Sequence, residues 1–367
     1  TRLQGDWSSD VCSSDLSKVA FKRRGSTMKD SAIIVTNQSD RNLEAKINAH
    51  KINVGLSACL AGKTVRYNGG HANSKLCMNH LTEHFNFETF CPEVAAGFGT
   101  PRPTMRLVGD PQNPTLEFTN ASTDENRTDL SQQLIDGFKD KLSSFSHLHG
   151  YILMKNSPSC GLERIKVYQE NGYTAKEKVS GLFTQALQRQ FPLLPVEEEG
   201  RLNDPLLYEN FITRVYAHSR FHEEVLNTPT LAALQAFHAS YKYVLLTYHH
   251  SSYKLLGKLI ADADSHDVED VINQYFHRFM LALGKPARSE HHTNTLLHIL
   301  GYLKKDVSPQ ARQKIADVID IYHKGQVPLI TPLTLLNHYV DQFGSDYIKT
   351  QRYLNPYPAT LGLANHV

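Results

Sequence analysis

The fold of the first half of this chain follows from residues 128–154, which read TDLSQQLIDGFKDKLSSFSHLHGYILM. Apolar side chains recur with helical spacing over residues 128–148, and Thr128 or Asp129 is placed to cap the N-terminus of that helix. The run Tyr151–Met154 is short and apolar, which is typical of a buried strand. Because a helix directly precedes this strand, we expect a parallel sheet with flanking helices, that is, an α/β domain.

Other short apolar runs bounded by Gly, Pro or Asn fit the same domain. A second helix is predicted over Ala175–Phe191, before the segment PLLPVEEEGRLNDP at residues 192–205 interrupts the pattern, and a third from Leu206 to about Ser219. The other predicted strands are Ile52–Leu56, Phe87–Phe90, Met105–Val108 and Ile165–Tyr168.

The second half of the chain consists of long amphipathic segments rich in Leu, Tyr, His and Ala, and strand-like alternation is nearly absent from it. We therefore predict an arm over residues 1–50, an α/β domain over 51–212 and an all-α domain over 213–367. The expected helices of the last domain are Thr230–Ala261, Val268–Leu283, Thr293–Lys304, Pro309–Lys324 and Leu333–Phe343.

Composition excludes several classes of protein. The 367 residues are 40% hydrophobic and 21% charged, with a net charge of +2, so disorder, collagen and coiled coil do not fit. No apolar run approaches the roughly 18 residues of a membrane span, and no secretory leader pattern is present, so we expect a cytoplasmic protein without membrane contact. The even charge balance gives no sign of a broad phosphate-binding surface, although it is compatible with a local basic groove. Nothing in the sequence indicates the oligomeric state.

The first residues do not fit the rest. Residues 6–16 read DWSSDVCSSDL, which matches a sequencing adapter translated in one frame. Trp7 and Cys12 are therefore excluded from the fold, and Met28 is the expected native start. We expect residues 28–50 to form a loosely held arm.

Three cysteines each follow a predicted strand. Cys59 lies in INVGLSACLAG, Cys91 in FETFCPEVAAGFGTPRP and Cys160 in GYILMKNSPSCG. In a parallel sheet these strand ends share one edge, where ligands bind, so the three thiols can meet. Thiolates select zinc, cuprous copper or an iron-sulfur cluster. Paired CxxC motifs of structural zinc sites are absent, and three unpaired cysteines suit a 4Fe-4S cluster with one open iron. The alternative is that they are buried apolar residues, the role we expect for Cys77.

The motifs around these cysteines resemble a known family. Four motifs resemble those of the TudS family of 2-thiouracil desulfidases. They are SACL at residues 57–60, followed by Arg66, Asn68 and their neighbours, CPE at 91–93, SPSCG at 157–161 and EEEGRL at 197–202. Four segments of the second half resemble the YbgA domain: FHASYKYVLLTYH (237–249), NTLLHILGY (294–302), KGQVPLITPLTLLNHY (324–339) and QRYLNPYP (351–358).

The resemblance implies a 4Fe-4S cluster held by Cys59, Cys91 and Cys160, whose fourth iron takes the sulfur of a thiolated pyrimidine. The implied reaction is a non-redox hydrolysis that releases sulfide. It needs a proton-transfer group, for which Glu93 is the first candidate, while Ser157 is a candidate to orient water or substrate. The alternatives are that Glu93 caps a helix starting at Val94 and that Ser157 only shapes its turn.

Four further side chains are candidates for contacting the substrate. Arg66 and Asn68 follow Cys59, Arg102 lies between two prolines, and Ser159 precedes Cys160. The alternative for Arg102 is a salt bridge with a carboxylate such as Asp129, and Ser159, like Ser157, has turn formation as its alternative. EEEGRL is usually a solvated face, but its arginine is also placed to pair internally.

The helical domain carries weaker signals. His218 and His222 have the i, i+4 spacing of helical metal ligands, but no HExxH or ExxH pattern accompanies them, so scattered histidines are expected. The tyrosines and lysines over residues 241–258 fit stacking on nucleic acid or, as we prefer, the core and rim of one long helix. The domain is therefore expected to deliver a thiolated RNA or nucleotide, or to mediate assembly. The rival hypotheses are a metal-stapled nucleic-acid-binding or repair-associated protein without catalysis, and a dehydratase-type enzyme.

Overall fold

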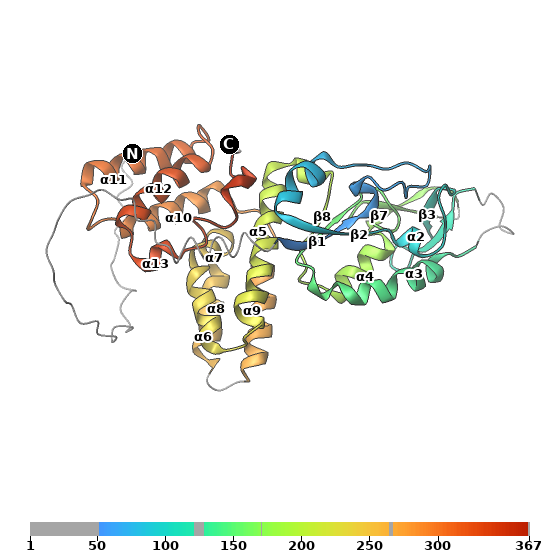
Figure 1. The fold of residues 1–367 in the computed structure, drawn as a ribbon, viewed down its shortest axis with the longest axis horizontal. Coiled ribbons are helices and arrows are strands. Elements are labelled where there is room, and N and C mark those ends of the chain that lie inside the picture. The colour runs from blue at the N-terminus through green and yellow to red at the C-terminus, as the bar shows by residue number, and fades with distance from the viewer. Residues whose placement is uncertain (1–50, 121–127, 170, 264–266, 366–367) are drawn as a thin grey trace. The chain divides into compact units, whose positions relative to one another are not determined.

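The computed structural model describes residues 51–120, 128–169, 171–263 and 267–365 (Figure 1). The expected arm, the adapter-like run and Met28 lie outside these residues. An α/β region is followed by a helical region, as the sequence predicts. No helix within the described ranges is both long enough and apolar enough to cross a bilayer.

The first sheet is entirely parallel and contains the strands that matter for the site. Its order is β2-β1-β5-β8, where β1 is Ile52–Ser57, β2 Phe85–Phe90, β5 Tyr151–Leu153 and β8 Val196–Glu198. Each neighbouring pair is parallel. The predicted strands at 52, 87 and 151 are thus confirmed, and their carboxyl ends share one edge of the sheet.

A second sheet was not expected. Its order is β4-β3-β6-β7, with β4 at Thr115–Phe118, β3 at Met105–Val108, β6 at Ile165–Tyr168 and β7 at Thr174–Val179. The predicted strands at 105 and 165 exist, but they pair with each other in this sheet, which has antiparallel partners at both edges. Local patterns identify strands but not the sheet in which they pair.

The predicted helix over Ala175–Phe191 is wrong in its first third. Residues 174–179 form β7, and the helix α4 begins only at Leu182 and ends at Gln190. Gly172, with φ of 80°, allows the tight turn that folds β7 back onto β6. The residues after Gly172 therefore form a strand, although their sequence pattern favours a helix.

Helices cover both faces of the parallel sheet. On one face lie α4 and α3, which spans Ser131–Ser143 and continues as a 3-10 turn to His147 (Figure 1). Their buried side chains, including Phe138 and Phe183, pack with Tyr151 and Leu153 of β5. On the other face, α5 (Pro205–Phe221) packs against Val54, Leu56 and Ile152. The sheet is thus the middle of three layers.

Gly137 is the position at which α3 approaches the segment after Cys91, so its substitution tests this packing. An added Cβ would lie 2.4 Å from Ala96 Cα. We expect Gly137→Ala to lower the free energy of unfolding by about 1–3 kcal/mol because the backbones cannot separate freely. Gly301→Ala is the matched control, since nothing lies within 4 Å of its added Cβ and no loss is expected. Urea denaturation of both variants checks this, and equal stability would contradict it.

The helical region contains most of the predicted helices. A π-helical turn, His222–Leu226, continues α5, and the largest core cluster of the described residues lies among the helices that follow. These are α6 Leu231–Ser240, α7 Lys242–Tyr248, α8 His250–Ala261, α9 Val268–Ala282, α10 Ser289–Tyr302, α11 Pro309–His323, α12 Ile330–Phe343 and the short α13 Asp346–Lys349.

The single helix predicted over 230–261 is three helices. The backbone leaves the helical region at His249 (φ −157°, ψ 88°), and the His249 imidazole accepts a hydrogen bond from the Ser252 amide at 3.3 Å. This side chain caps α8 and so starts a new helix. The apolar period continues through the break, which is why the pattern alone does not reveal it.

Candidate functional site

Three strand ends carry the cysteines of the candidate site. Cys59 lies in a 3-10 turn that directly follows β1, and Cys91 is the N-terminal cap of the four-residue helix α2 (Pro92–Ala95) after β2. Cys160 lies in the loop that follows β5. All three are free thiols. Because β1, β2 and β5 are parallel neighbours, these loops lie at the same edge of the sheet.

The three thiols line one cavity of about 170 Å³. Their sulfur atoms do not all lie within 4.8 Å of one another, whereas ligands of one tetrahedral zinc ion stand about 3.8 Å apart. A cluster with a different iron for each cysteine suits the wider spacing. The donor set therefore fits an iron-sulfur cluster better than a single ion.

Burial decides the protonation of these cysteines. It raises the pKa of Cys59 to about 11, with a further contribution from Cys91, and it raises the pKa of Cys91 as well. The pKa of Cys160 is raised well above its usual value, again first by burial. Without metal, the three groups are neutral thiols at pH 7, so metal binding must displace protons.

Glu93 is held by groups from two loops. Its Oε1 accepts hydrogen bonds from Ser157 Oγ at 3.2 Å and from Ser159 Oγ, while its Oε2 pairs with the Arg102 guanidinium. Glu93 and Ser157 both line the cavity. The carboxylate thus has a defined orientation beside the three thiols, which a proton-transfer group requires.

Arg102 supports this arrangement from below the surface. Its side chain is 2% exposed, and Nη1 donates to the carbonyl oxygens of Val65 at 3.0 Å and Gly99 at 2.8 Å. The salt-bridge partner is Glu93 and not Asp129, whose carboxylate instead accepts a hydrogen bond from the Ser131 amide. Most donors of Arg102 are therefore engaged by the protein, so the side chain positions Glu93.

The remaining predicted substrate contacts differ in place. Arg66 lines the cavity and lies over the Tyr67 ring, 5.7 Å from its centroid. Asn68 is exposed, accepts a hydrogen bond from the Gly70 amide and is not part of the lining. Ser159 is buried behind the cavity, where it meets Glu93. Of these, Arg66 is the one that a bound molecule would reach directly.

The buried pair of Arg102 and Glu93 makes a stability prediction. We expect Arg102→Gln to lower the free energy of unfolding by about 3–5 kcal/mol, because it leaves the nearly buried Glu93 carboxylate without its partner. Arg66→Gln, at a half-buried arginine of the same cavity, should change it by less than about 0.5 kcal/mol. Thermal and urea denaturation of both proteins measures the difference. An Arg102→Gln protein as stable as wild type would contradict a stabilising role for the Arg102–Glu93 pair.

Sequence reasoning missed one charged group at the cavity. Lys155 lines it and is exposed, two residues after β5 ends. The signal was available, because the rule that placed the cysteines at strand ends also applies to this lysine. Lys155 adds a positive charge at the side of the cavity formed by the loop after β5.

Two other expectations near the site have clear outcomes. Cys77 is fully buried in an apolar cluster and does not line the cavity, as expected of a packing residue. The EEEGRL run is not a solvated face, since Glu197 and Glu198 are each 7% exposed. Arg201 pairs internally, with its Nε 2.7 Å from Glu197 Oε1. This ion pair lies at the C-terminal end of β8, the last strand of the α/β region.

The aromatic residues of the helical region serve mainly its core. Tyr241 and Tyr243 are each 2% exposed, and the Tyr253 ring stacks on His238 with centroids 5.2 Å apart. Lys242 Nζ lies 5.4 Å from the Tyr243 ring centroid. These rings are therefore not free to stack on bases of a nucleic acid.

A second cavity, of about 380 Å³, lies in the helical region. Three of the four segments that resemble the YbgA domain contribute to its wall, through residues such as Tyr248, Asn337 and Tyr353. Among the residues that the structure describes, its lining includes Glu209 and Asp341 but no lysine or arginine. This charge disfavours a phosphate-bearing occupant.

Two family models match separate parts of the chain. Residues 54–199 match the model described as 2-thiouracil desulfurase, and residues 242–358 match a model described as protein of unknown function DUF1722. The first match contains all three cysteines and Glu93.

Curated relatives cover the two parts in turn. The chain is 31% identical over 156 residues to the uncharacterized protein YbgA of Escherichia coli (strain K12), covering 42% of this chain and 92% of YbgA. It is also 31% identical over 154 residues to the uncharacterized protein YbbK of Bacillus subtilis (strain 168), covering 41% of this chain and 98% of YbbK. A solved structure described as the 4Fe-4S-dependent thiouracil desulfidase TudS aligns with 26% identity over 42% of this chain and 95% of its own, with a TM-score of 0.31.

Proposed function

Because this chain belongs to the 2-thiouracil desulfurase family through residues 54–199 and to the DUF1722 family through residues 242–358, we propose that its first domain removes sulfur from a 2-thiouracil-type pyrimidine. The observation that supports this most is the convergence of Cys59, Cys91 and Cys160 on one cavity beside Glu93. Buried free thiols that share a cavity with an oriented carboxylate combine a metal-binding set with a proton-transfer group.

The three cysteines would hold a 4Fe-4S cluster, each as the ligand of one iron. Such a cluster, when bound, supplies a Lewis-acidic iron without a protein ligand, which suits a thiocarbonyl sulfur. Cys59 and Cys160 are buried and Cys91 is half-buried, so the cysteine side of the cavity is shielded from bulk water.

The protein groups would carry out the proton transfers of a balanced hydrolysis. Water adds to C2 of the thiocarbonyl, the C–S bond breaks, and the products are the pyrimidine carbonyl compound and hydrogen sulfide, without any change of oxidation state. Glu93 would take the proton from the attacking water and return it to the leaving sulfur. Ser157 and Ser159, with Arg102, hold the two oxygens of this carboxylate in place.

Binding of the base would use the exposed side of the cavity. Arg66 and Lys155 line it and can donate hydrogen bonds to a pyrimidine carbonyl oxygen. The Tyr67 ring, 42% exposed, lines the same cavity and offers a face on which a base can stack. The substrate is therefore proposed to be a small thiolated pyrimidine, free or within a nucleotide.

The test is anaerobic reconstitution of the full chain with iron and sulfide, followed by iron counting and assay with 2-thiouracil. We expect about four irons per chain from the proposed cluster, and release of sulfide matched mole for mole by uracil. A protein that binds four irons but releases no sulfide would redirect the proposal to another substrate. Zinc bound by the three cysteines in place of iron would overturn the cluster itself.

A further inference from the structure

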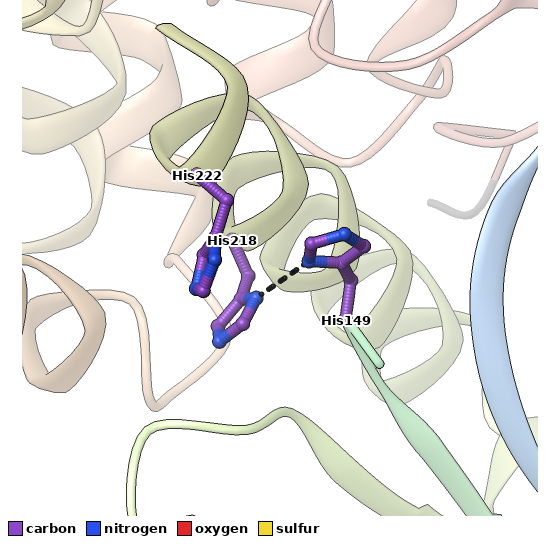
Figure 2. Close-up of side chains that lie close together, drawn as sticks. All are labelled: His149, His218 and His222. Carbon is purple, nitrogen blue, oxygen red and sulfur yellow. Dashed lines mark hydrogen bonds between the residues drawn. The ribbon is translucent and has the colours of Figure 1, made fainter. Parts of the chain in front are cut away.

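Three histidines meet at a place remote from the cysteines. His149 lies just before β5, while His218 is in α5 and His222 begins the turn that follows it (Figure 2). One ring nitrogen of each lies within 4.8 Å of the others. Since Cys160 follows β5 and His149 precedes it, the histidines lie at the opposite edge of the parallel sheet. The sequence shows only the spacing of His218 and His222, because the third member comes from 69 residues earlier than His218.

We propose that His149, His218 and His222 form a second metal site, which binds a zinc-like divalent transition-metal ion and leaves one coordination position to water. This inference is independent of the proposed desulfidase activity. Three imidazoles are a donor set that suits zinc and its neighbours in the periodic table, and three protein ligands with an open position are typical of reactive zinc sites.

The distances between the rings support this assignment. His149 Nδ1 and His218 Nδ1 are 3.1 Å apart, and Figure 2 shows these two atoms turned toward each other. Two nitrogens bound to one tetrahedral zinc ion stand about 3.3 Å apart, so a small movement would admit the ion between them. One ring nitrogen of His222 lies within 4.8 Å of both others, and its ring, which stacks on that of His218 with centroids 4.5 Å apart, has to tilt to aim that nitrogen at the ion.

The surroundings hold these rings in place and keep them neutral. The Phe276 ring lies 5.2 Å from His218 and 5.5 Å from His222, centroid to centroid, and the His149 backbone amide donates to the backbone carbonyl oxygen of Asn53 in β1 at 2.9 Å. Burial lowers the pKa of all three histidines, that of His149 to about 4. Neutral imidazoles are the form that binds metal, so at pH 7 no proton has to leave.

One charge opposes the ion. The Arg214 guanidinium, one helical turn before His218, belongs to a half-buried side chain and adds to the lowering of that histidine's pKa by burial and by the other two histidines. Glu197 attracts this guanidinium and so offsets part of its field. The repulsion that remains acts against any dication, which makes the measured affinity a direct test of whether the three imidazoles outweigh it.

The experiment uses the full chain with Cys59, Cys91 and Cys160 all replaced by serine, so that no cysteine set competes for metal. Zinc is titrated by calorimetry and cobalt by visible absorption, which distinguishes nitrogen from thiolate ligands. We expect one zinc per chain and a higher melting temperature with zinc. If the triple serine variant does not fold, zinc binding is measured instead on the wild-type chain after its cysteines have been loaded with the cluster.

The histidine variants decide the site. His218→Gln and, at a less buried position, His222→Gln should each weaken zinc binding by at least ~100-fold, because loss of a direct ligand exceeds the 10–100-fold effect of outer partners. His277→Gln is the matched control, an exposed histidine of α9 beside Phe276, and it should bind zinc as before. Circular dichroism checks folding. No zinc bound by the parent, or equal binding by all variants, overturns the proposal.

Discussion

Alanine at Cys59, Cys91 or Cys160, one at a time, is expected to abolish both cluster binding and sulfide release. Each thiol comes from a different strand end, and no other cysteine of the described residues lines the cavity to replace it. Loss of an iron's stabilisation of the leaving sulfur removes several kcal/mol, so we expect at least a ~10³-fold drop in kcat/KM for 2-thiouracil. Iron content and sulfide release after anaerobic reconstitution measure the two effects together.

Cys77→Ala is the matched control for this series. Cys77 is fully buried, whereas Cys91 is half-buried, and Cys77 does not line the cavity. Its alanine variant should bind the same amount of iron and keep its activity, with only a modest loss of stability from the small void. A variant of Cys59, Cys91 or Cys160 that kept four irons and full activity would remove that residue from the ligand set.

The second large effect is expected at Glu93. We expect Glu93→Gln to lower kcat by about 10²–10⁴-fold while iron binding persists, because the amide keeps the size of the carboxylate but cannot shuttle a proton. The variant also leaves Arg102 without its charged partner, so its stability has to be measured alongside. Single-turnover sulfide release at saturating 2-thiouracil isolates the chemical step.

A control carboxylate separates catalysis from general charge effects. Glu163→Gln removes a half-exposed carboxylate that pairs with Arg201 outside the cavity, and it should leave kcat unchanged. The rate-against-pH profile gives a further readout, since only loss of the proton-transfer group should flatten one of its limbs. If Glu93→Gln is folded, loaded with iron and as fast as wild type, another group transfers the proton, and Lys155 becomes the candidate.

The elements of this protein were largely predictable because they depend on local pattern. Apolar runs bounded by turn residues identified β1, β2, β3, β5 and β6, and helical spacing identified α3, α5 and α9 to α12. The pattern missed β4 and β8, and it failed where one residue redirected the chain. Gly172 turned an apparent helix into β7, and the His249 side chain started a new helix inside an unbroken apolar period.

The candidate site was predictable in part for a similar reason. Strand ends of a parallel sheet share an edge, so the convergence of Cys59, Cys91 and Cys160 followed from their positions in sequence. The side-chain contacts around these cysteines could not be derived from sequence positions. The alternative for Arg102, a salt bridge with a carboxylate such as Asp129, did not name the partner, and only the fold shows that this carboxylate is Glu93.

The sequence by itself therefore determined most of the strands and helices, though not β4, β7 or β8, and the strand ends at which the thiols lie. Tertiary structure decided which strands share a sheet, which carboxylate Arg102 meets, and that His149 joins His218 and His222. The physical reason is that backbone preference and apolar period act over a few residues. These contacts lie beyond that reach and form only once burial of apolar surface has brought helices, sheets and loops together.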